Sequence, residues 1–230
     1  MNYRAWIDHV RAFSEGLQKV PGKIACTIQI DPPLSSAALS DLESKWSNGL
    51  PESLKDLWTW GSGRVSCQYV WTPTREELPR LNEIFESNDY IYGGVRFEPA
   101  HAVFPGNSGA DPNDKEMLGT LGRRDFDRLC KSALFLHVGN GDYLGLDTEK
   151  NPSDPPVVYH MHDEPASFYL SPSFSSFLKD WTELSFIGPE FWLLDYWFVR
   201  ENGRNDRENG RIDTTRHKTD DLRRLLSPRR

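Results

Sequence analysis

The sequence has little cysteine, with three residues at widely separated positions and no Cys-x-x-Cys spacing. An odd number of scattered cysteines indicates neither a disulfide framework nor a zinc knuckle, and it favours a reducing compartment. Long apolar runs are also absent, because Pro189, Glu190 and Asp195 interrupt the richest segment, residues 186–199. We therefore expect no signal peptide, no membrane span and a cytoplasmic protein.

Positive charge is scarce in the main part of the chain. The whole sequence has 27 basic and 34 acidic residues, and nine of the basic and six of the acidic ones fall in residues 201–230. Residues 1–200 therefore contain 18 basic and 28 acidic side chains, a balance of −10, against +3 for the last segment. An acidic body argues against direct binding of nucleic acid and favours a basic protein partner.

A β-hairpin is the clearest structural signal in the sequence. Apolar residues alternate along 134–138 and again along 144–146, on either side of a Gly-Asn-Gly-Asp sequence. Asn-Gly is the commonest dipeptide in turns that need positive φ at both central residues, so we place the turn at Asn140-Gly141. Residues 156–159 predict a third strand beside this hairpin.

A helix should close the sheet after the third strand. Ser171-Pro172 predicts its start. The serine would be the capping residue, and the proline would stand where the backbone amide makes no hydrogen bond within the helix. Large apolar side chains then recur at helical spacing and need a sheet face to cover: Phe174, Phe177, Leu178, Trp181 and Leu184.

The rest of the chain is expected to pack around the hairpin and its closing helix. We expect a packing helix over residues 2–18, helices over 39–61, and strands over 65–71 and 90–97, with Gly93-Gly94 marking a bulge or the close approach of another backbone. Residues 1–200 should form a single domain, followed by a charged and mostly disordered tail at 201–230 with one short helix near 222–226.

Histidines offer the strongest enzyme-like pattern. His160 and His162 would point to the same side of a strand, and His137 on a neighbouring strand could complete a zinc site with an open position. No carboxylate at ligand spacing completes a known signature, and neither a dinucleotide loop nor a nucleophile elbow is present. We therefore expect no cofactor and no catalytic constellation, and we keep a zinc-dependent hydrolase as a third alternative.

Four segments in order resemble the SUKH superfamily, which includes a fungal cell-wall-assembly regulator and many bacterial immunity proteins. The resemblance covers residues 39–184. The segments are the Leu-Pro helix at 50–61, the Gly-x-Gly-Asp hairpin at 138–147, the strand ending in His-Asp at 157–163 and the Phe-x-x-Phe-Leu helix at 174–181. The resemblance implies an α+β fold with helices packed on one side of a mainly antiparallel sheet.

The implied function is not enzymatic. Bacterial members neutralise a cognate toxin, often a nuclease, by binding it inside the producing cell, and the alternative is a regulatory scaffold similar to the fungal members. An acidic body fits a basic toxin as partner. We expect Asp142, Asp163 and Glu164 among the acidic contacts and Tyr92 as an aromatic anchor.

Overall fold

The computed structural model describes residues 1–47, 49–86, 88–109, 119, 121–162, 166–201, 208–216 and 218–228. Its first sheet is antiparallel, in the order β1-β2-β3, with β1 at Lys23–Ile30, β2 at Val65–Thr72 and β3 at Ile91–Arg96. Along β2 every second side chain is buried, and those between them are exposed or half-buried. One face of this sheet therefore lies against the core and the other faces solvent.

The second sheet is also antiparallel, in the order β4-β5-β6-β7. Its strands are β4 at Ala133–His137, β5 at Tyr143–Leu146, β6 at Val157–His160 and β7 at Ser167–Ser171. Every residue of β6 and β7 is buried. This sheet is therefore covered on both faces, and the α+β fold with antiparallel sheets that the sequence predicts is confirmed.

The two sheets meet at the end of β3. A β-bridge joins Phe97 to Leu136, and the amide of Glu98 donates to the carbonyl of Phe135 at 2.8 Å. In a second close approach, β3 lies against the segment that follows α7 at Phe174–Glu183. Glycine is needed there, because a side chain at Gly93 would collide with the carbonyl of Phe186. The predicted close approach of another backbone at Gly93-Gly94 is confirmed.

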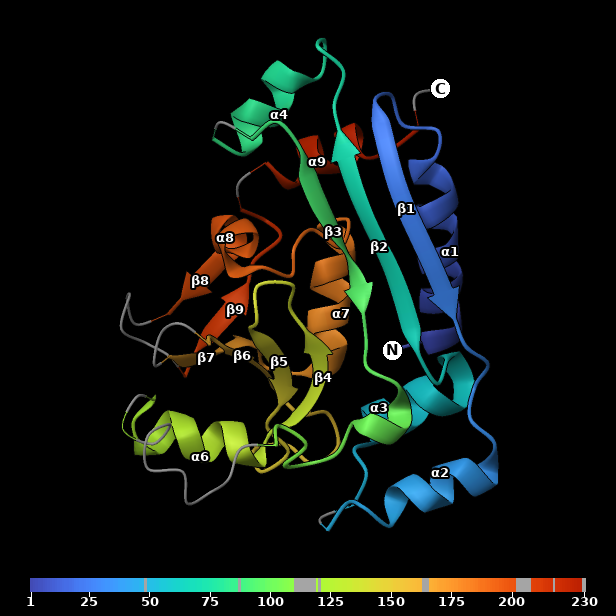
Figure 1. The fold of residues 1–230 in the computed structure, drawn as a ribbon, viewed down its shortest axis with the longest axis vertical. Coiled ribbons are helices and arrows are strands. Elements are labelled where there is room, and N and C mark those ends of the chain that lie inside the picture. The colour runs from blue at the N-terminus through green and yellow to red at the C-terminus, as the bar shows by residue number, and fades with distance from the viewer. Residues whose placement is uncertain are drawn as a thin grey trace.

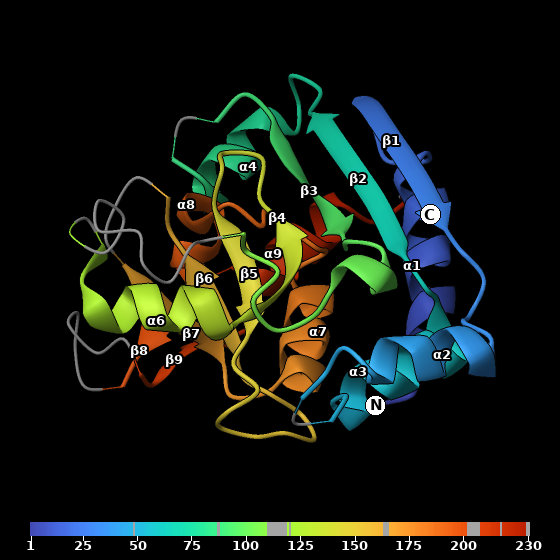
Figure 2. The same cartoon turned by 60° about the horizontal axis from the view of Figure 1, so that its bottom comes forward.

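Helices pack around the sheets and leave one face of the β1-β2-β3 sheet open, as Figures 1 and 2 show. Their bounds are α1 Tyr3–Leu17, α2 Ser36–Glu43, α3 Glu52–Asp56, the π-helix η1 Leu57–Gly61, α4 Leu78–Ile84, η2 Ala100–Ala102, α6 Arg123–Lys131, α7 Phe174–Glu183, α8 Phe191–Leu194, η3 Asp195–Trp197 and α9 Thr219–Leu225. Helices α1 and α7 share one side of the sheets, where the indole of Trp6 donates to Thr182 at 3.0 Å. No helix among the described residues is long and apolar enough to cross a membrane.

Helix α7 packs as the sequence predicts but begins later. Its apolar side chains Phe174, Phe177, Leu178 and Trp181 are all fully buried. The capping residue is Ser173, whose hydroxyl accepts from the amide of Ser176 at 3.1 Å. The prediction of Ser171 as the cap is wrong, because Ser171 pairs with Val157 as the last residue of β7.

The hairpin lies where it is predicted, with a different turn. Gly141 has a φ of 100°, whereas Asn140 is not among the residues with positive φ. The amide of Gly141 donates to the carbonyl of Val138 at 3.1 Å, and the amide of Val138 donates to the carbonyl of Asp142 at 2.8 Å. This is a three-residue loop with glycine in the left-handed position, so the predicted two-residue turn with positive φ at both centres is wrong.

The C-terminal segment is folded where the structure describes it, and the prediction of a mostly disordered tail is wrong there. Strand β9 at Gly210–Ile212 pairs with β8 at Phe198–Arg200. The indole of Trp197 donates to the hydroxyl of Thr219 at 2.7 Å. Four apolar side chains of this segment join the same core as α1 and α7: Ile212, Leu222, Leu225 and Leu226.

Candidate protein-interaction surface

Asp142 stands at the end of the hairpin loop, and its carboxylate is almost wholly buried. Its Oδ2 accepts from the Tyr159 hydroxyl at 2.6 Å and from Asn140 Nδ2 at 2.7 Å. Its Oδ1 accepts from the backbone amide of His162 at 2.8 Å and contacts His162 Nδ1 at 2.7 Å. Burial alone would raise the pKa of Asp142, but these hydrogen bonds together hold it below its ordinary value.

Tyr159 links this loop to α8. Its hydroxyl donates to Asp142 and accepts from the amide of Phe191 at 3.1 Å. Burial raises the pKa of Tyr159 well above its ordinary value, and the neighbouring Asp142 raises it further. The hydroxyl therefore stays protonated, so that the loop and the start of α8 are held in one fixed arrangement.

Glu190 lies against the same loop. A side chain at Gly139 would approach Glu190 Oε1 to 3.1 Å, so the glycine permits close packing there. Burial raises the pKa of Glu190, and the negative charge of Asp142 adds to the effect. Its Oε2 is buried and has no hydrogen-bond partner among the described residues. Backbone hydrogen bonds from Gly139 and from Glu190 itself act on the pKa in the opposite direction, so this carboxyl group is satisfied only in part.

Three aromatic side chains, Tyr90, Tyr92 and Trp192, form what we call the aromatic patch. The first and last are each 53% exposed, and Tyr92 is half-buried. The rings of Tyr90 and Tyr92 lie 6.2 Å apart. Burial and the nearby Glu190 raise the pKa of Tyr92 to about 12, with a contact from Trp192 acting in the opposite direction. The patch therefore connects the start of β3 with α8.

Acidic residues stand next to the aromatic patch in the chain. Asp89 precedes Tyr90, Asp195 follows Trp192 by three positions, and both are exposed. Exposed Trp and Tyr side chains provide large contact areas at low entropic cost, and charges at the rim guide an oppositely charged partner. The chemistry of this surface suits a protein partner that presents basic residues around an apolar centre.

The predicted contact residues have different positions in the structure. Tyr92 belongs to the aromatic patch. Asp142 is 2% exposed and holds the loop together, so its prediction as a direct contact is corrected: its carboxylate faces Tyr159 and His162. Asp163 and Glu164 lie outside the described residues. Sequence reasoning missed Trp192 and Glu190, although the apolar spacing of Leu193 and Leu194 leaves Trp192 on the outer side of α8.

The histidines do not converge. His160 is buried, and its two ring nitrogens contact Ser167 Oγ at 2.9 Å and Ser132 Oγ at 3.1 Å. His162 is directed to Asp142, whereas exposed His137 contacts the ring of Tyr143. No group of three or more potential metal ligands occurs in the described part of the chain. The interpretation of these three residues as a zinc set is therefore wrong for the geometry observed.

Comparison with protein families matches residues 33–180 to the SMI1 / KNR4 family (SUKH-1). The match covers more than half of the chain, and it includes both main sheets except β1. The chain therefore belongs to the SMI1 / KNR4 family. Searches of curated proteins and of solved structures gave no match. The matched segment ends before α8, so Trp192 lies outside it while Tyr90 and Tyr92 lie inside.

Proposed function

We propose that this chain is a non-enzymatic immunity protein that binds and neutralises a cognate bacterial toxin, and that the aromatic patch is the centre of the interface. The observation that carries the proposal is the exposure of Tyr90 and Trp192 on either side of Tyr92, which lies near the buried carboxyl of Glu190. Large exposed aromatics beside acidic residues are typical of the anchor points at which protein partners bind. The acidic balance of residues 1–200 favours a basic toxin.

Several features support this function over a catalytic one. Asp142, Tyr159 and His160 are engaged in internal hydrogen bonds that fix the fold. The hairpin loop and α8 are tied together by Tyr159, so the patch is presented on a rigid support. A preorganised surface loses little conformational entropy when a partner binds.

The test is a search of the genes beside the one for this chain for a toxin domain, followed by co-expression with that domain. Wild-type protein should restore growth and form a stable complex on a sizing column. Charge reversal of the rim by Asp89→Lys and Asp195→Lys should slow association and weaken its dependence on salt, since rim charges act mainly on the association rate. A neighbouring toxin that is neither bound nor neutralised would overturn the immunity role, and binding without restored growth would support the regulatory scaffold instead.

A further inference from the structure

Three cationic side chains converge on one carboxylate at the far end of the second sheet. Glu208 Oε1 accepts from Arg128 Nη2 at 2.6 Å and forms an ion pair with Arg124, and its Oε2 accepts from Lys150 at 2.7 Å. Arg124 and Arg128 belong to α6, Lys150 follows β5, and Glu208 comes just before β9. We call Arg124, Arg128 and Lys150 the cation cluster.

Two members of the cation cluster lie over the ring of Tyr169. The Arg128 guanidinium lies 4.8 Å from the ring centre and the Lys150 ammonium 4.1 Å from it. The Arg128 side chain is only 10% exposed, and its Nη1 donates to the carbonyl of Ser167 at 3.2 Å. Its position is therefore set by the protein interior and does not depend on Glu208 alone.

Glu208 is not the only carboxylate near the cation cluster. Asp125 lies 3.7 Å from Arg128, and Asp147 accepts from the Tyr169 hydroxyl at 2.5 Å. The cation cluster then faces two carboxylates besides that of Glu208. If the Glu208 carboxylate moves out, Arg124, Arg128 and Lys150 lose the acceptor that they share and can donate to another oxyanion.

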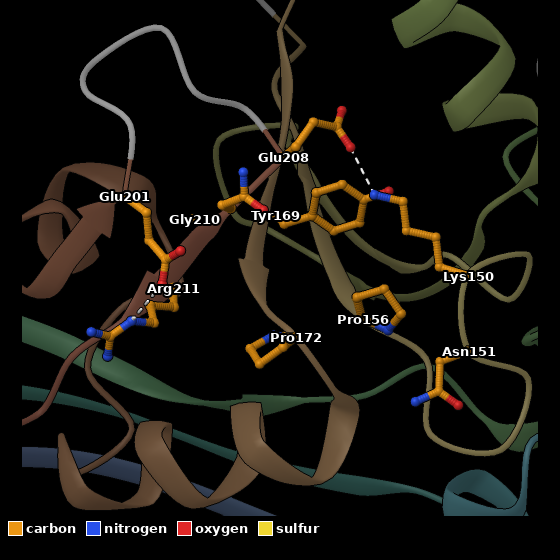
Figure 3. Close-up of a pocket in the computed structure, with 10 residues that line it drawn as sticks. Lys150, Asn151, Pro156, Tyr169, Pro172, Glu201, Glu208, Gly210 and Arg211 are labelled. Atoms are coloured by element: carbon orange, nitrogen blue, oxygen red, sulfur yellow. Dashed lines mark hydrogen bonds and ion pairs between the residues drawn. The ribbon is translucent and has the colours of Figure 1, made fainter.

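A pocket of about 400 Å³ opens beside the cation cluster. Figure 3 shows Lys150 on one side of it and Arg211 on the other, with the ring of Tyr169, Pro156 and Pro172 between them. Pockets of this size hold small organic ligands, and flat apolar side chains suit a planar ring system. Lys150 and Glu208 give the pocket a charged wall, and Arg211 pairs with Glu201 across from them. Arg124 and Arg128 line an adjoining pocket, which shares Lys150 and Tyr169 with this one, so the two pockets meet at the carboxylate of Glu208.

We propose that this pocket binds a phosphate monoester on a ligand of about mononucleotide size, whose phosphate replaces the carboxylate of Glu208 on the cation cluster. A phosphate dianion has more charge and more acceptor oxygens than a carboxylate, so it matches three cations better. Glu208 then acts as an internal competitor for the ligand. This inference concerns a surface apart from the aromatic patch and stands independently of the proposed immunity role.

The experiment is calorimetric titration of the full chain with AMP, with inorganic phosphate and with adenosine, which lacks the phosphate. AMP should bind, phosphate should bind more weakly, and adenosine should show no comparable affinity. Lys150→Ala should weaken AMP binding at least about tenfold, because it removes one charge-assisted contact. Glu208→Gln should tighten it, because the competing charge is lost while the side chain keeps its size.

A matched control comes from a second ion pair. Lys55 and Glu43 are 2.6 Å apart on the surface formed by α2 and α3, and Glu43→Gln should leave AMP affinity unchanged. Thermal unfolding of each variant shows whether the fold is kept, and Glu208→Ala provides a second removal of the charge. Absence of AMP binding at millimolar concentration, equal binding of adenosine, or unchanged or weaker AMP binding by both Glu208 variants would overturn the proposal.

Discussion

The two main sheets share antiparallel pairing and differ in what covers them. Along β2 the side chains of Val65, Cys67, Tyr69 and Trp71 are buried, while Gln68, Val70 and Thr72 are exposed on the open face. In β6 and β7 every side chain is buried. The first sheet therefore exposes one face to solvent, whereas the second sheet is buried. Substitutions in the second sheet should lower the free energy of unfolding.

The second sheet gains its double cover from elements on both of its faces. On one face Tyr159 and Phe168 stack with ring centres 5.4 Å apart, and Phe168 contacts Phe191 of α8. On the other face Arg128 of α6 lies over Tyr169. Phe168 and Tyr169, which are neighbours in β7, thus pack on opposite faces of the second sheet. Substitutions can test this difference between the two sheets.

The largest effect is expected in the core between the sheets and α7. Trp181→Ala should lower the free energy of unfolding by about 3–5 kcal/mol, because a fully buried ring leaves a cavity that its neighbours fill only in part. Val70→Ala on the open face of β2 is the control and should change stability by less than about 0.5 kcal/mol. Urea unfolding measures both, and equal losses would show that the open face is packed after all.

Substitution of a buried residue in α9 should also lower the free energy of unfolding. Leu222→Ala should cost about 2–4 kcal/mol, because the side chain is fully buried in the common core. Arg224→Ala, on the exposed side of the same helix, is the matched control and should cost far less. A Leu222→Ala protein with the wild-type melting temperature would mean that α9 does not dock on the body.

The stability of the protein should also depend on pH through His160, which lies in the second sheet. Burial, aided by the positive charge of Arg128, lowers the pKa of His160 to about 3. Because the folded pKa lies below the ordinary unfolded value of about 6.5, the unfolded state binds more protons between these limits. The contribution of His160 to stability is thus complete above about pH 6.5 and is lost progressively as the pH falls towards 3.

Replacement of the buried ring tests this dependence. His160→Gln should lower stability at neutral pH and flatten its fall between pH 6.5 and 4, whereas His137→Gln at an exposed position should leave the slope unchanged. Chemical unfolding at a series of pH values measures the slope. An unchanged slope in His160→Gln would assign the acid sensitivity to other groups.

Sequence patterns predicted the elements whose periodicity is simple. The β-forming residues of 65–71 and the alternation around the hairpin gave strands in the right places, and the spacing of Phe174, Phe177 and Trp181 gave α7. Strand β7 was missed because Ser-Phe-Tyr-Leu-Ser is buried on both sides and so lacks alternation. Because Ser171 is the last residue of β7, the capping residue of α7 is Ser173 and not Ser171.

The charged tail misled for a physical reason. High charge and low apolar content are typical of disorder, yet three leucines at helical spacing were enough to dock α9. The candidate site was predictable only in part. Sequence indicates that Tyr92 can anchor a partner, but the meeting of Tyr92 with Trp192 depends on long-range packing. Whether Asp142 faces water or the Tyr159 hydroxyl is likewise decided by the fold.

The smallest effect on stability and the largest effect on binding should come from the aromatic patch. The most direct test of the proposed interface is the dissociation constant for the proposed toxin partner, measured by surface plasmon resonance for the Tyr90→Ala, Trp192→Ala double variant. The account predicts a loss of about 100-fold or more through faster dissociation, with the melting temperature kept, because exposed aromatic anchors dominate interface energies. Trp60 is 58% exposed in η1, which follows directly on α3, and Figure 1 shows α3 well away from α8. Trp60→Ala should therefore bind as wild type. Wild-type affinity of the double variant, or an equal loss in Trp60→Ala, would contradict the assignment of the aromatic patch as the interface.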